Sequence, residues 1–191
     1  MMALIKDMKS KKDHPGQPRL VVSNNTKADG LVFAEKNSVE TFAFDIEQIE
    51  DNLIFEEKTL QVLKEKNIDI ICLAGFMKIL SEKFIKSFSK PILNIHPSLL
   101  PSFKGLNTHQ RALKAGCLIH GATVHQITSK VDEGPILGQT LIDITKYSTE
   151  KQLEEKLLPL EHLLYKKVLR EFLEESGKKI LTINYAEDLQ N

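Results

Sequence analysis

The sequence predicts an α/β protein with a mainly parallel, twisted sheet flanked by helices. Strand-like and helix-like segments alternate along the 191 residues, and no internal repeat or Pro/Gly/Ser-rich linker interrupts them. Hydrophobic residues make up 41% of the chain and charged residues 27%, which is close to the composition of ordinary globular domains. Because this length suits one domain, we expect residues 1–191 to form a single domain.

The first half of the chain alternates short helices and strands. Leu4, Ile5 and Met8 have helical spacing, and the lysines that follow suit the last turn of a helix. Residues 68–74 are almost continuously apolar, which is typical of a central strand. Ser81 is expected to cap a short helix. The remaining elements are expected as strands at 19–23 and 41–44 and helices at 31–36 and 51–66.

The second half begins with a strand at 92–96, after Pro91. Strands are also expected at 122–127 and 136–144, with turn residues between them, and at 179–184 at the edge of the sheet. A helix at 107–115 should end at Gly116. A long helix from about Thr149 carries leucines at 153, 157, 160 and 164, and Pro159 should kink it.

Charge and cysteine content exclude several classes of protein. The 26 basic and 26 acidic side chains balance, which does not indicate a nucleic-acid binder. Cys72 and Cys117 are too few for a disulfide framework, which favours a reduced, cytoplasmic compartment. No apolar run approaches the roughly 20 residues of a membrane-spanning helix, so no membrane association is expected.

Asn94 and His96, at the end of a predicted strand, are the strongest candidates for chemistry. Residues two apart in a strand project to the same side, so both can reach one small site. An amide can donate hydrogen bonds to a developing oxyanion, and an imidazole can act as acid, base or electrostatic stabiliser. The alternative is that His96 only forms a hydrogen bond within its own loop.

Asp132 is the candidate partner of His96. A carboxylate beside an imidazole orients the ring and favours its protonated form. Asp132 could equally be an ordinary turn residue before Gly134. The histidines at 109, 120 and 125 include no i, i+4 pair of the familiar zinc type, so we expect no metal.

Four segments carry a specific resemblance: LAGFMKILS at 73–81, NIHPSLLP at 94–101, HGATVH at 120–125 and DEGP at 132–135. Together they closely resemble the folate-dependent formyltransferases, and among these the glycinamide ribonucleotide formyltransferases. The likeness runs from the first residues to about residue 144, and more loosely through the long helix. It implies a Rossmann-like formyltransferase fold and formyl transfer from 10-formyltetrahydrofolate to the amine of glycinamide ribonucleotide, in purine biosynthesis and without a metal.

The resemblance also implies roles for individual residues. Asn94, His96 and Asp132 would be catalytic: Asn94 and protonated His96 stabilise the oxyanion, and Asp132 keeps His96 protonated and in position. Glu161 and Pro97 would contact the nucleotide. Lys78 stands where the family commonly has arginine, so its contact to the folate can differ. The folate-binding residues would be Met77, Lys78, Ile79, Leu80, Asn94, Thr128, Ser129 and Val131.

The family's first strand and its glycine-rich phosphate loop have no counterpart here, since no glycine precedes Gly16. One alternative is therefore a truncated chain, or a folate-binding remnant that lacks nucleotide-phosphate binding. The other is a related folate-dependent enzyme, such as methionyl-tRNA formyltransferase or formyltetrahydrofolate deformylase. The expected partners are the two small-molecule substrates, with the protein a monomer or a homodimer.

Overall fold

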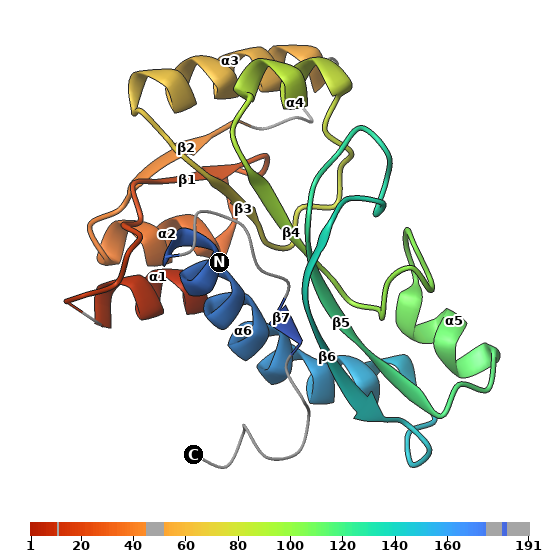
Figure 1. Ribbon diagram of the computed structural model, residues 1–191. Helices are drawn as coiled ribbons and strands as arrows, with labels where there is room; N and C mark the ends of the chain where they lie inside the picture. Colours follow the sequence, from red (N-terminus) through yellow and green to blue (C-terminus); the bar gives the residue numbers. More distant parts are fainter. Residues whose placement is uncertain (11, 45–51, 175–180, 183–191) are drawn as a thin grey trace. The chain divides into compact units, whose positions relative to one another are not determined.

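The computed structural model describes residues 1–10, 12–44, 52–174 and 181–182 (Figure 1). The chain divides into two compact units, residues 1–91 and 92–191, each with its own packed elements. The predicted α/β class is confirmed, because helices and strands alternate in both units. The single-domain organisation stays a prediction.

The first unit contains a two-stranded parallel sheet covered by helices. Strand β1 (Leu20–Ser23) pairs with β2 (Glu40–Ala43), and α2 (Asp29–Lys36) forms the crossover between them. Helix α1 (Met2–Ser10) packs on α2. Their shared core is apolar and centres on the buried side chains of Ile5, Ala34 and Val39.

The rest of the first unit contains the loop at residues 76–80. Helix α3 (Asn52–Glu65) lies beside α4 (Glu82–Phe88), and β3 (Ile71–Leu73) lies between them in the sequence (Figure 1). The hydroxyl oxygen of Ser81 accepts a hydrogen bond from the Phe84 N–H at 3.0 Å, so the predicted helix cap is confirmed. Position 51, where the predicted helix began, lies outside the described residues.

The second unit is built around strands that lie in the order β4, β5, β6, β7. Strand β5 (Ile119–Gln126) runs antiparallel to both β4 (Ile92–His96) and β6 (Ile136–Asp143), whereas β7 (Leu181–Thr182) is parallel to β6. The antiparallel β5–β6 pair follows from its short connection, since parallel neighbours need a crossover of a dozen or more residues. The other residues of the predicted 179–184 strand lie outside the described part.

Two helices accompany these strands. Helix α6 (Glu150–Glu174) runs along β5 and β6, and α5 (Thr108–Lys114) packs against α6 (Figure 1). The predicted leucine stripe of α6 supplies its buried face through Leu153, Leu157 and Leu164, followed by Val168. The helix is continuous through Pro159. Gly116, with φ +66°, follows the end of α5, as predicted.

None of the helices among the described residues is long and apolar enough to span a membrane.

Candidate functional site

The second unit gathers Asn94, His96 and Asp132 at one place. Asn94 and His96 lie near the end of strand β4, and Asp132 lies in the loop that joins β5 to β6. Nδ1 of His96 is 3.5 Å from Oδ2 of Asp132, and the side chains are only 8% and 10% exposed. The site therefore contains a shielded imidazole and carboxylate in close contact.

The other nitrogen of His96 is also engaged. Its Nε2 lies 3.0 Å from the backbone oxygen of Phe103, which can only accept, so Nε2–H is the donor. Nδ1 faces the Asp132 carboxylate, which is likewise an acceptor. A doubly protonated ring satisfies both contacts, and the acceptors fix the orientation of the ring.

His125 lies between Asn94 and Asp132. It lies directly opposite Asn94 in the antiparallel β4–β5 ladder, and its side chain is fully buried. The amide nitrogen of Asn94 is 3.2 Å from Nε2 of His125, which also lies 3.5 Å from Oδ1 of Asp132. Burial lowers the pKa of His125, which favours the neutral ring. Nδ1 lies 3.3 Å from the Gln126 oxygen, which can only accept, so in the neutral ring Nδ1 carries the hydrogen and Nε2 accepts the Asn94 N–H. This hydrogen bond fixes the orientation of the Asn94 side-chain amide.

Backbone geometry brings Asp132 to this position. Asp132 has φ +53°, a left-handed conformation that Asp and Asn tolerate better than most residues. A Cβ at Gly134 would lie 1.7 Å from the Gln126 oxygen, so only glycine allows the loop to pass this close to β5. Oδ2 of Asp132 also accepts the N–H of Gly105 at 2.8 Å. The carboxylate thus ties two loops together.

A buried polar network fixes the loop that follows His96. The hydroxyl of Thr123 donates to the Ser98 oxygen at 2.7 Å and accepts the Leu100 N–H at 3.0 Å. The side-chain amide of Gln139 donates to the Leu100 oxygen and to the Thr123 hydroxyl oxygen, at 3.0 and 2.9 Å. Because every hydrogen of these groups is used, the loop has one well-defined conformation.

An open hollow adjoins Asp132. Lys104 and Glu133 form an ion pair at 2.8 Å beside it, and the Lys104 ammonium lowers the pKa of Glu133. The apolar part of the wall is supplied by neighbouring loop and strand residues. The lining residues are Leu100, Pro101, Lys104, Asp132, Glu133, Gly134 and Ile136. A small organic molecule placed here would contact the Asp132 carboxylate.

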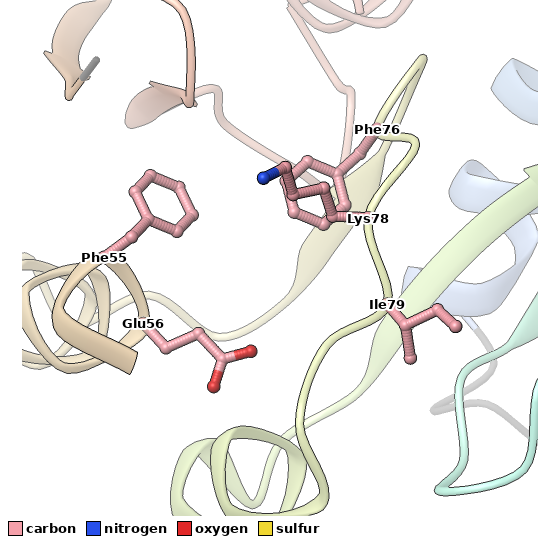
Figure 2. Close-up of a pocket in the computed structure, with 5 residues that line it drawn as sticks. All are labelled: Phe55, Glu56, Phe76, Lys78 and Ile79. Atoms are coloured by element: carbon pink, nitrogen blue, oxygen red, sulfur yellow. The ribbon is translucent and has the colours of Figure 1, made fainter. Parts of the chain in front are cut away.

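The remaining predicted residues are distributed over both units. Thr128, Ser129 and Val131 are exposed in the loop that contains Asp132, and Pro97 directly follows His96. Glu161 is partly buried on α6, and burial raises its pKa to about 7. The stretch 77–80 belongs to the first unit, where Lys78 and Ile79 line a small hollow with Phe55, Glu56 and Phe76 (Figure 2).

His125 was not predicted as a site residue: the sequence suggested it only as a possible metal ligand, and no metal was expected. The available signal was its position two residues after Thr123 on one predicted strand, which puts both side chains on the same face of the sheet. Which strand lies opposite His125 depends on the order of strands in the sheet. Among the described residues, no group of three or more His, Cys, Asp or Glu side chains is arranged to hold a metal ion.

Comparison with known proteins gives consistent results. The family model described as formyl transferase matches residues 1–169. The phosphoribosylglycinamide formyltransferase of Haemophilus influenzae is 38% identical over 162 residues, which cover 85% of this chain and 76% of the relative. The chicken trifunctional purine biosynthetic protein adenosine-3 is 41% identical over 151 residues, or 79% of this chain, but the match spans only 15% of that longer protein.

Solved structures show the same similarity. The phosphoribosylglycinamide formyltransferase of Anaplasma phagocytophilum is 34% identical, with a TM-score of 0.86 over 97% of this chain and 92% of that chain. The enzyme of the same name from Brucella melitensis is 39% identical, with a TM-score of 0.84 over 96% of this chain and 92% of that chain.

Proposed function

Because the chain belongs to the formyl transferase family, we propose that it transfers a formyl group from 10-formyltetrahydrofolate to the amine of glycinamide ribonucleotide, a step of purine biosynthesis. The observation that carries the proposal is the buried contact between His96 and Asp132, with the Asn94 amide held nearby by its hydrogen bond to His125. The relatives that bear the name phosphoribosylglycinamide formyltransferase support the choice of acceptor.

The proposed reaction is direct attack of the ribonucleotide amine on the formyl carbon. Attack forms a C–N bond and places negative charge on the formyl oxygen and positive charge on the attacking nitrogen. Collapse of this tetrahedral intermediate breaks the bond to N10 of the folate, and the proton lost by the amine ends on that nitrogen. The products are formylglycinamide ribonucleotide and tetrahydrofolate, so no oxidant and no covalent enzyme intermediate are required.

Asn94 and His96 stabilise the oxyanion in this proposal. The Asn94 amide is already fixed by His125 and needs no reorganisation when charge develops. The Nε2–H of His96 can donate its hydrogen bond to the oxyanion instead, because its present acceptor is the uncharged Phe103 carbonyl. Asp132 holds the opposite side of the ring and stabilises its positive charge.

The residues assigned to the folate lie in two loops, one in each unit. One contains Thr128, Ser129 and Val131, beside the hollow at Asp132. The other is residues 77–80, where the exposed side chains of Met77 and Ile79 offer apolar surface to a flat ring. Lys78 lies in the same loop and supplies a positive charge for a carboxylate of the folate. Glu161 and Pro97 are assigned to the nucleotide.

Steady-state kinetics with both substrates test this function. We expect stoichiometric formation of tetrahydrofolate and formylglycinamide ribonucleotide, and loss of at least a hundredfold in kcat for His96→Ala. Binding of folate without turnover would instead identify a folate-binding relative. Turnover by His96→Ala within a fewfold of the unaltered protein would overturn the role given to His96.

A further inference from the structure

Glu56 is a buried carboxylate that the proposed reaction does not use. It lies on α3 in the first unit and is only 7% exposed, whereas the next residue, Glu57, is exposed and pairs with Lys83 on the surface. Burial of a carboxylate is costly unless hydrogen-bond donors surround it. The position of Glu56 therefore depends on the groups that it contacts.

Both carboxylate oxygens of Glu56 are directed at Ser81. Oε1 accepts the backbone N–H of Ser81 at 2.7 Å, and Oε2 accepts the hydroxyl of the same residue. Because the only hydrogen of that hydroxyl is given to Glu56, its oxygen is free to accept the Phe84 N–H at the start of α4. Glu56 thus fixes both the backbone and the rotamer of Ser81.

Ser81 directly follows the loop at 76–80. Met77 and Ile79 in this loop are 75% and 73% exposed. Among the described residues, the backbone groups of Phe76, Met77, Ile79 and Leu80 make no hydrogen bond to another backbone group. The loop is bounded by Gly75, with φ +69°, before it and by Ser81 after it.

Glu56 and residues of this loop line the same hollow (Figure 2). The Glu56 carboxylate points from α3 towards the segment that carries Ile79, and the aliphatic part of Lys78 faces the same hollow. Glu56 therefore both binds Ser81 and forms part of the wall of the hollow. A change at Glu56 would be felt first by the backbone of residues 78–80.

We infer that Glu56 is a positioning residue for the formyl donor, acting through Ser81 on the backbone of residues 77–80. This inference rests on the proposed function, which assigns that loop to the folate. A loop held in its binding conformation loses less entropy when the ligand orders it, so the anchor strengthens folate binding. The ribonucleotide and the chemical step do not depend on this loop, so kcat at saturating folate should change little.

Three variants test the inference. Glu56→Ala removes both acceptors, and Glu56→Gln keeps one carbonyl oxygen for the Ser81 N–H but cannot accept the hydroxyl in the same way. Glu57→Gln is the matched control, because it removes the same charge from the adjacent, exposed position. Circular dichroism and the thermal unfolding midpoint show which variants are folded, and Glu56→Gln keeps the test usable if Glu56→Ala does not fold.

Titration calorimetry with tetrahydrofolate and, separately, with glycinamide ribonucleotide provides the readout. We expect the Kd of tetrahydrofolate to rise about tenfold in Glu56→Ala and by a smaller factor in Glu56→Gln, and to stay within twofold in Glu57→Gln. The Kd of the ribonucleotide should stay within twofold in all three. In turnover assays, KM for the formyl donor should rise while kcat stays within twofold.

The outcomes separate this inference from the proposed function. Unchanged tetrahydrofolate affinity in the Glu56 variants, or equal weakening of both ligands, would overturn the positioning role even if the unaltered protein transfers formyl groups. Absence of tetrahydrofolate binding by the unaltered protein would overturn it as well. Selective loss of tetrahydrofolate affinity without any turnover by the unaltered protein would support Glu56 and refute the transferase assignment.

Discussion

Replacement of Asp132 by asparagine isolates the charge of the carboxylate from its shape. Asparagine is nearly isosteric, tolerates the φ of +53° at this position, and keeps an oxygen that can accept the Gly105 N–H. The loop should therefore keep its conformation. What is lost is the negative charge 3.5 Å from Nδ1 of His96.

The magnitude follows from the distance and from the shielding of the pair. Two opposite unit charges 3.5 Å apart attract by about 5 kcal/mol at an effective dielectric constant of about 20, a value suited to side chains that are about nine-tenths shielded. Each factor of ten in rate corresponds to about 1.4 kcal/mol, so complete loss would exceed a thousandfold. Since the asparagine dipole retains part of the interaction, we expect kcat to fall by about 10²- to 10³-fold.

The assay is the initial rate of tetrahydrofolate formation at saturating concentrations of both substrates, with KM measured for each. Glu133→Gln is the control, because it removes the same charge from the adjacent residue. Its pair with Lys104 is on the surface and is screened by solvent, so kcat should stay within about threefold. A kcat for Asp132→Asn within fivefold of the unaltered protein, or equal losses in both variants, would refute the reasoning.

Three further predictions concern other residues of the second unit. Gly134→Ala should lower the free energy of unfolding by more than about 2 kcal/mol or prevent folding, because its Cβ would overlap the Gln126 oxygen; denaturant titration with no loss of stability would contradict this. His125→Leu leaves the Asn94 amide without its acceptor, which costs about 1–3 kcal/mol, so kcat should fall about tenfold to a hundredfold; an unchanged kcat would remove His125 from the site. Burial lowers the pKa of His120 to about 4. The unfolded chain therefore binds more protons than the native state between about pH 4 and 6.5, and stability should rise with pH across that window, with a weaker rise in His120→Gln; equal pH dependence in the two proteins would refute the assignment.

Much of the fold could be predicted from local patterns, since most elements depend on residues near them in the sequence. Ser81 as a helix cap, Gly116 after α5 and the leucine stripe of α6 are confirmed. The antiparallel pairing of β4 with β5 is a different case, because the pairing of strands distant in the sequence is decided by the packing of the whole sheet.

The candidate site was predictable to a similar degree. Asn94 and His96 could be paired from their spacing on one strand, and the structure brings Asp132 to them. His125 could not be found in this way, because it is 31 residues from Asn94 in the sequence. Their contact arises from the register of two antiparallel strands. Glu56 could not be found for the same reason: its partner Ser81 is 25 residues away, just before another helix.

The fate of the formyl group tests the central claim most directly. The protein is incubated with 10-formyltetrahydrofolate, with and without glycinamide ribonucleotide, and tetrahydrofolate, formylglycinamide ribonucleotide and formate are quantified together. We predict that tetrahydrofolate forms only when the ribonucleotide is present, with one formylglycinamide ribonucleotide for each tetrahydrofolate. Release of formate in the absence of the ribonucleotide, with no formylated product when it is added, would contradict the assignment and identify a deformylase instead.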